Sequence, residues 1–176
     1  MAFPTSFRFS LLLLLCVMLT GQIFAQDQKT YEGEGYRMTY PSSWSIDDSQ
    51  TRAQAIFFFS PQDGPADNFR ENVNLMVQDL TPDQATMKDY LTLSKKQFKD
   101  YNATVLELSE VPDPADGFPE AFISYTMPMG EFDLQFIARV KIKGQKAYLL
   151  TYTSTIDNFE QYLEDGKAII ESFSFM

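Results

Sequence analysis

The segment that most constrains the fold is residues 132–143, the longest run of alternating apolar and polar side chains in the sequence. Apolar side chains stand at every second position from Phe132 to Ile142, with mostly polar residues between them. This period of two predicts a β-strand with one buried face. Gly144 and Gln145 then have the form of a tight hairpin turn, and residues 146–154 return as a second strand. The pattern therefore predicts an antiparallel sheet.

Further strands with apolar alternation or short apolar runs are predicted before this hairpin. They span residues 36–40, 55–60, 72–80, 104–110 and 120–127. Short turns between successive strands favour antiparallel pairing throughout. We expect no internal repeat and one continuous domain from residue 36 to residue 176.

Two amphipathic helices are predicted to cover the sheet. The first starts at a capping box made by Thr86 and Asp89 and ends near Asn102. The second is predicted to start at Asp157, a good N-cap residue, and its apolar stripe continues to residue 173. Gly166 lies within that stripe, which indicates close approach of the helix backbone to the sheet. The sum is an α+β fold, an antiparallel β-sheet flanked by helices.

Residues 1–25 have the organisation of a cleavable signal peptide. Arg8 lies in the short leading segment, residues 11–19 are an unbroken apolar run, and Ala25 precedes the expected cleavage site before Gln26. An uncleaved anchor is the alternative, although the run is short for a membrane span. A lipoprotein at Cys16 is disfavoured because Leu15 stands where a small residue is needed. The expectation is export to the periplasm or the medium, with no membrane span after cleavage.

The remaining chain is expected to hold a short flexible leader over residues 26–35 and one domain over residues 36–176. The chain has no histidine, and its single cysteine lies in the signal peptide. The mature domain therefore lacks the residues for a disulfide, a thiol nucleophile, a histidine-ligated zinc site or a Ser-His-Asp triad. We expect no catalytic residues and no cofactor.

The charge balance of the domain is strongly acidic. Cleavage leaves 13 Lys and Arg against 24 Asp and Glu. This excess disfavours nucleic acid and anionic membranes as partners. It permits a cationic partner or divalent ions, although solubility alone also accounts for it.

Calcium is the one metal that the composition allows, because its ligands are hard oxygen atoms. Asp113, Asp116 and Glu120 gather acidic groups on a proline-rich loop, and Asp47-Asp48 is a second acidic pair. These spacings do not match an EF-hand loop, and acids in loops commonly serve turn formation. A pair of carboxylates of the glycosidase type stays open, because such pairs meet only in the fold.

Three large aromatic residues could line a ligand site or fill the core. Trp44 follows a strand-ending proline, and Tyr148 and Tyr152 alternate on one strand face. We expect all three to be core residues packed beneath a helix.

The order of these features resembles the PsbP-like family, which includes the bacterial envelope protein DcrB and the Mog proteins. The matching segments are 36–41 with Trp44, 56–60, 72–77, the helix through Tyr90, 148–152 and 169–173. The resemblance implies a PsbP-like αβα sandwich and a binding or accessory role. The histidine-containing metal sites of some photosynthetic members cannot exist in a chain without histidine, and the long N-terminal extension of those members is missing.

The sequence therefore predicts an exported, non-catalytic accessory or binding protein of the cell envelope or extracellular space, with a protein as its partner. The alternative is a module that binds a small ligand or calcium. The second alternative is a carboxylate-based hydrolase.

Overall fold

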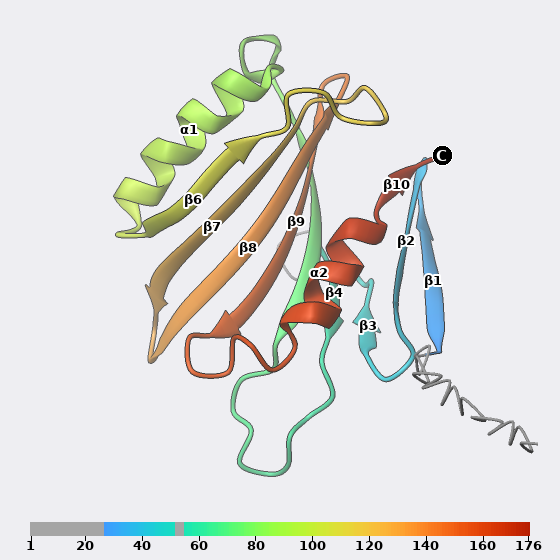
Figure 1. Cartoon of the computed structure of the whole chain (residues 1–176), viewed down its shortest axis with the longest axis vertical. Coiled ribbons are helices and arrows are strands. Elements are labelled where there is room, and N and C mark those ends of the chain that lie inside the picture. The colour runs from blue at the N-terminus through green and yellow to red at the C-terminus, as the bar shows by residue number, and fades with distance from the viewer. Residues whose placement is uncertain (1–26, 52–54) are drawn as a thin grey trace, which may run out of the picture.

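The structure, a computed structural model, describes residues 27–51 and 55–176. It has three layers (Figure 1). A seven-stranded antiparallel sheet lies in the middle, with helix α1 on one face, and helix α2 and a small three-stranded sheet on the other. The predicted signal peptide, with Ala25 and Gln26 at its cleavage site, lies outside the described residues.

In chain order the elements are β1 (Gln28–Gly33), β2 (Tyr36–Pro41), β3 (Ser45–Asp47), β4 (Ala55–Phe59), β5 (Asn72–Asp79), a 3₁₀ turn η1 (Pro82–Gln84), α1 (Met87–Asp100), β6 (Thr104–Glu110), β7 (Glu120–Met129), β8 (Phe132–Lys143), β9 (Lys146–Thr155), α2 (Leu163–Ser172) and β10 (Ser174–Phe175). The predicted α+β class and the antiparallel sheet flanked by helices are confirmed.

The hairpin of β8 and β9 occupies the centre of the large sheet, whose order is β3-β4-β5-β9-β8-β7-β6. Gly144 has a φ of +62° in its turn, a conformation that favours glycine. The alternating positions of β8 from Leu134 to Ile142 are all buried, as the sequence predicted. Because the strands on both sides pair in register, this alternation continues across the sheet.

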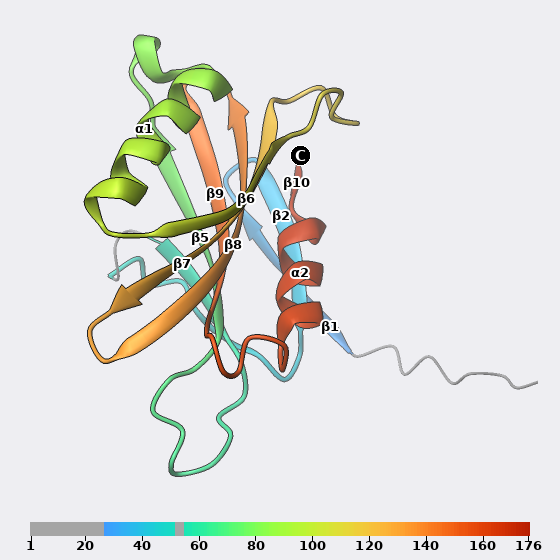
Figure 2. The same cartoon turned by 60° about the vertical axis from the view of Figure 1, so that its left-hand side comes forward.

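Each face of the sheet has its own core. Figure 2 shows the two helices on opposite sides of the large sheet, α1 on one and α2 on the other. On the α1 side, Met87 and Leu91 pack with apolar residues of β7, β8 and β9, including Ile123 and Val140. On the α2 side, the core is larger and mostly aromatic. It contains Trp44, Phe58, Tyr148, Leu150, Tyr152, Phe159, Ile169, Ile170 and Phe173. The expectation that Trp44, Tyr148 and Tyr152 are core residues is confirmed.

The start of α1 agrees with the sequence. The side chain of Thr86 accepts a hydrogen bond from the backbone N–H of Asp89 at 3.2 Å and donates one to the Asp89 carboxylate. The helix ends at Asp100, and Asn102 has a φ of +56° just beyond it.

The predicted flexible leader is wrong for residues 28–33, which form β1. This strand pairs with β2 along its whole length, and the Tyr31 ring meets the Phe58 ring edge-on, with centroids 6.1 Å apart. Most β1 side chains are exposed because β1 is an edge strand. The segment therefore lacks the apolar alternation from which the other strands were predicted.

The predicted start of the second helix at Asp157 is also wrong, since α2 starts at Leu163. Residues 157–162 form turns instead. The carbonyl of Phe159, which a longer helix would use internally, accepts a hydrogen bond from the Tyr152 hydroxyl at 3.0 Å. After the helix, Ser174 and Phe175 form β10 on β2, a strand that the sequence did not predict.

Gly166 lets α2 lie directly on the sheet, as expected. A Cβ atom at this position would lie 2.5 Å from Cδ2 of Tyr152, a fully buried side chain. We predict that Gly166→Ala lowers the free energy of unfolding by roughly 1–2 kcal/mol, because overpacking of about 1–3 kcal/mol outweighs about 1 kcal/mol of gained helix propensity. Urea unfolding measures this change. The adjacent Lys167→Ala should stay within about 0.5 kcal/mol of wild type, and a stabilised Gly166→Ala would contradict the close approach.

Candidate functional site

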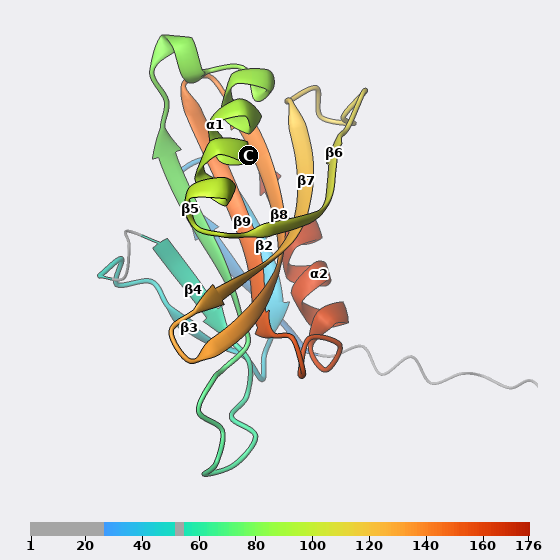
Figure 3. The same cartoon turned by 90° about the vertical axis from the view of Figure 1, so that its left-hand side faces the viewer.

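The α1 side of the sheet is covered only in part. Figure 3 shows α1 over the upper part of this face, with no helix over the lower part. Strand pairing places one row of side chains across this face, in the order Tyr125, Phe136, Thr153, Asn72 and Phe59, with Tyr125 in contact with Phe98 of α1. Polar side chains on the central strands are therefore flanked by aromatic side chains on both sides.

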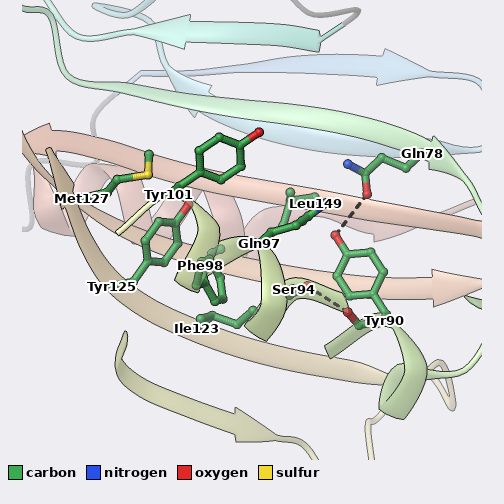
Figure 4. Close-up of a pocket in the computed structure, with 11 residues that line it drawn as sticks. Gln78, Tyr90, Ser94, Gln97, Phe98, Tyr101, Ile123, Tyr125, Met127 and Leu149 are labelled. Carbon is green, nitrogen blue, oxygen red and sulfur yellow. Dashed lines mark hydrogen bonds between the residues drawn. The ribbon is translucent and has the colours of Figure 1, made fainter. Parts of the chain in front are cut away.

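A cavity of about 180 Å³ lies between α1 and the sheet (Figure 4). Apolar and uncharged polar side chains share its lining. They are Gln78, Tyr90, Ser94, Gln97, Phe98, Tyr101, Ile123, Tyr125, Met127, Ala138 and Leu149. No charged side chain is among these described lining residues, so the cavity suits a neutral molecule with apolar and polar parts.

Hydrogen bonds fix part of the polar lining. The Tyr90 hydroxyl donates to Oε1 of Gln78 at 3.1 Å, and the Ser94 hydroxyl donates to the Tyr90 carbonyl at 2.9 Å. Burial raises the pKa of Tyr90 to about 12, and burial with a smaller effect of Tyr90 raises the pKa of Tyr125 to about 12. Both phenols therefore keep their protons at neutral pH and can act as hydrogen-bond donors.

Aromatic stacking fixes the position of Tyr125, one of the residues that line the cavity. The ring of Tyr125 lies between Phe98 of α1, with centroids 4.7 Å apart, and Phe136 of β8, at 4.5 Å and nearly parallel. This stack ties the C-terminal half of α1 to β7 and β8. The helix is thus fixed over the cavity at this end.

A second, open pocket of about 460 Å³ lies on the same face of the sheet, toward β4. Its lining consists of Phe57, Phe59, Asn68, Phe69, Arg70 and Asn72. The shared face follows from strand pairing, since Asn72 pairs with Phe59 and with Thr153. The two hollows are separate, because no described residue lines both of them.

The structure brings together two of the three acids considered for calcium, but around a lysine. Nζ of Lys141 lies 2.7 Å from Oδ2 of Asp116 and 2.9 Å from Oε2 of Glu120, and Nε of Arg139 donates to Oε1 of Glu120 at 2.7 Å. Burial by itself raises the pKa of Glu120, but these two cations outweigh it and lower that pKa.

The ammonium group thus occupies the place that a calcium ion would need. In the described structure, no hydrogen bond or ion pair joins Asp113 to this group. Within residues 27–51 and 55–176, no three acidic side chains gather in an arrangement that could hold a metal ion. Asp47, of the second acidic pair, accepts hydrogen bonds from the backbone and hydroxyl of Ser49.

Glu71 is a buried carboxyl group on the opposite, α2 side of the sheet. It is 1% exposed and accepts hydrogen bonds from the hydroxyls of Ser60 and Ser154, each at 3.3 Å. Loss of hydration raises its pKa, and the hydrogen bonds reduce this effect only in part. With so little exposure, a substrate cannot reach this carboxyl group.

Three other acids line one open hollow near the loop after β4: Asp63, Asp67 and Asp157. The carboxylate of Asp63 accepts hydrogen bonds from Nε2 of Gln161 and from the Tyr162 hydroxyl. Both carboxylate oxygens of Asp63 are therefore already engaged by side chains of the protein.

Sequence reasoning missed the residues that form both hollows, Ser94 and Arg70 among them. Ser94 carried a usable signal, because a serine in the apolar stripe of a helix leaves space beneath it. Arg70 carried none, since its surroundings come from β3, β4 and the loop between β4 and β5.

Comparisons with known proteins identify the fold. No protein-family model matches the chain, and no curated protein matches it by sequence. Solved structures do match. The cyanobacterial PsbP protein, CyanoP, from Synechocystis sp. PCC 6803 aligns with a TM-score of 0.64 at 17% identity, covering 89% of this chain and 96% of CyanoP.

Two further structures come from bacteria. LpqN, described as involved in cell envelope biogenesis of Mycobacterium tuberculosis, aligns with a TM-score of 0.56 at 11% identity, over 85% of this chain and 91% of LpqN. PA94 of Pseudomonas aeruginosa, a protein of unknown function, gives 0.54 at 15% identity, over 80% and 91%. At these identities the similarity establishes the fold alone. The chain has the PsbP-like fold, as the resemblance in its sequence implied.

Glu71 generates a prediction about pH. Its folded-state pKa is raised, so its contribution to stability is present below the unfolded-state pKa and is lost as the pH rises through the folded-state value. Glu71→Gln does not titrate, and we expect it to gain stability relative to wild type from about pH 4 toward neutrality. Urea unfolding across this range measures the difference. Glu107→Gln, at an exposed position, is the control, and a difference for Glu71→Gln that stays flat with pH would refute the assignment.

Proposed function

We propose that the chain is an exported, non-catalytic binding protein that holds a small neutral amphipathic molecule between α1 and the sheet. The signal-peptide pattern of residues 1–25 supports export. Among the described residues, no helix is both long and apolar enough to cross a membrane.

The observation that carries this proposal is the cavity under α1. Cavities of roughly 150 Å³ hold one aromatic ring in other proteins, so about 180 Å³ suffices for a single-ring ligand. Side chains such as Leu149 and Ile123 offer it apolar contacts, and Gln97 and Tyr101 offer polar ones. Burial of the ring supplies most of the affinity, and the polar groups select its orientation.

Absence of catalysis is supported by residue chemistry. The mature sequence has neither histidine nor cysteine. The buried Glu71 is closed to substrates, and the ion-paired Glu120 has a lowered pKa. These properties do not favour a carboxylate-based hydrolase. Calcium binding at Asp116 and Glu120 is disfavoured in the same way, because Lys141 already neutralises these groups.

A protein partner is the second candidate, and one surface favours it. Exposed large apolar side chains lie on α1, at its C-cap and on the adjoining edge strand β6: Leu93, Tyr101, Val105 and Leu106. We propose that an extended segment of a partner adds to β6 as an eighth strand. A photo-crosslinker at position 106 that captures no protein in the envelope fraction would count against this candidate.

Export can be tested directly. Protein recovered from the periplasm or the culture medium is expected to begin at Gln26, because Ala25 meets the small-residue requirement at the cleavage site. N-terminal sequencing checks this. Recovery of folded protein from the cytosol with its first 25 residues intact would contradict export.

The cavity generates a paired variant test with phenol as the probe. Ser94→Leu is expected to fill the cavity and to weaken phenol binding at least tenfold, as measured by NMR titration. Thr92→Leu is the matched control, because Thr92 makes the same hydroxyl bond to the carbonyl four residues earlier, at 2.8 Å, on the exposed side of α1. Its phenol affinity should equal that of wild type.

Two results would contradict the proposed site. One is equal phenol affinity in the wild type and Ser94→Leu. The other is phenol-induced shifts that avoid Tyr125 and Met127. Circular dichroism confirms that both variants fold, so loss of binding is not mistaken for loss of structure.

A further inference from the structure

We propose that the open pocket beside Arg70 binds a small carboxylate that carries an aromatic or other flat apolar group. In the part of the chain that the structure describes, this pocket shares no lining residue with the cavity under α1. It combines one cation, two amides and three phenylalanine rings. Each of these features adds a separate constraint on the ligand.

The protein itself holds the guanidinium of Arg70 in position. Nε donates to the Ser60 carbonyl at 2.9 Å, and Nη2 donates to the Ser45 hydroxyl at 2.9 Å and also to the Ser60 carbonyl. These bonds come from β3 and the end of β4, so the group is fixed before any ligand arrives. Preorganisation of this kind reduces the entropy lost on binding.

The remaining nitrogen of Arg70 is open to a ligand. Within the described residues, Nη1 has no hydrogen-bond partner, and no buried side-chain nitrogen or oxygen lacks one. Nη1 is therefore in contact with solvent, and it carries two N–H donors. A carboxylate oxygen is the strongest common acceptor for such donors, because both groups are charged.

Charge distribution also favours an anion at this place. The chain has a formal charge of −10, yet Arg70 forms no ion pair within residues 27–51 and 55–176. Among its described lining residues, the pocket beside Arg70 has no acid, whereas the neighbouring hollow contains Asp63, Asp67 and Asp157.

The acids close to Arg70 in the sequence accept hydrogen bonds from other residues. Asp67 accepts hydrogen bonds from the backbone N–H groups of Asp63 and Phe69. Glu71 lies on the opposite face of the sheet with Ser60 and Ser154. Neither carboxylate lines this pocket, so Arg70 is the one charged group among the described lining residues that an incoming anion meets.

The three phenylalanine rings of the pocket favour a flat apolar group attached to the carboxylate of the ligand. Phe57 and Phe59 stack nearly parallel, at 8°, with centroids 5.6 Å apart, and the Arg70 guanidinium lies 5.3 Å from the Phe59 centroid. Phe69 forms another wall and packs on Phe132 at 5.2 Å. Flat apolar groups bury the most area against such walls, which adds to the charge interaction.

The side-chain amides of the pocket can orient the ligand. Asn72 donates from Nδ2 to the Arg70 carbonyl at 3.2 Å, which directs its Oδ1 away from that bond. Asn68 contributes a second amide to the lining. A ligand with a hydroxyl or N–H beside its carboxylate could therefore donate to this side of the pocket.

The test uses benzoate and its neutral isostere benzamide on the full mature protein. We expect benzoate to bind with saturation at millimolar concentration and to shift the NMR signals of Phe57, Asn72 and the Arg70 side chain. Benzamide should bind at least tenfold more weakly, because it has the ring without the charge. This comparison needs no variant, so it stands even if a substitution at Arg70 impairs folding.

Variants add the second half of the test. Arg70→Gln is expected to weaken benzoate binding at least tenfold, and Arg70→Lys should retain part of it. Arg37→Gln is the matched control, since Arg37 is an exposed arginine on the small sheet whose Nε bonds Ser174 at 3.4 Å. Its affinity for benzoate should equal that of wild type.

Several results would overturn the proposal. Equal affinity for benzoate and benzamide would remove the role of charge, and equal affinity in Arg70→Gln would remove the role of Arg70. Displacement of benzoate by an equal concentration of inorganic phosphate would remove the role of the ring. The variant Ser94→Leu should still bind benzoate, so failure of the cavity under α1 and failure of this pocket are separate outcomes.

Discussion

Burial of both faces of the central β8–β9 hairpin is the constraint on which the rest of the structure depends. One face of this hairpin supports α1, and the other supports α2 with the small sheet. Because successive side chains point to opposite faces, each of the two strands contributes to two cores at once. The difference between the cores matters for function. The α2 side is densely aromatic, whereas the α1 side is covered over only part of its area and keeps two hollows.

Sequence periodicity predicted those parts of the fold that local side-chain pattern determines. The β8–β9 hairpin, the start of α1 at Thr86 and the close approach at Gly166 all depend on residues near one another in the chain. Errors occurred where contacts with a neighbouring segment of the chain decide. The strand β1 exists because β2 offers it a partner, and residues 157–162 turn instead of coiling because Tyr152 takes the Phe159 carbonyl. Neither contact can be recognised from the residues of the wrongly predicted segment alone.

The candidate sites were harder to predict for the same reason. The acidic loop at residues 113–120 suggested a metal, but Lys141 of β8, which lies opposite Glu120 in the strand pairing, neutralises it. Nothing in the sequence distinguishes Arg70 from a surface cation, because its surroundings come from Ser45, Ser60 and the phenylalanines of β4. A cluster of charge in the sequence therefore proved less informative than a single charge whose partners come from other strands.

The two end strands of the domain flank one strand, since β1 and β10 both pair with β2. The last residue is held as well, because the Met176 N–H donates to the Gly35 carbonyl at 3.0 Å. This small sheet lies across the large sheet from α1 (Figure 2). A surface-coupled sensor attached through the carboxyl terminus would accordingly present the hollowed face to the solution. A short spacer beyond Met176 would keep the coupling chemistry from separating β10 from β2.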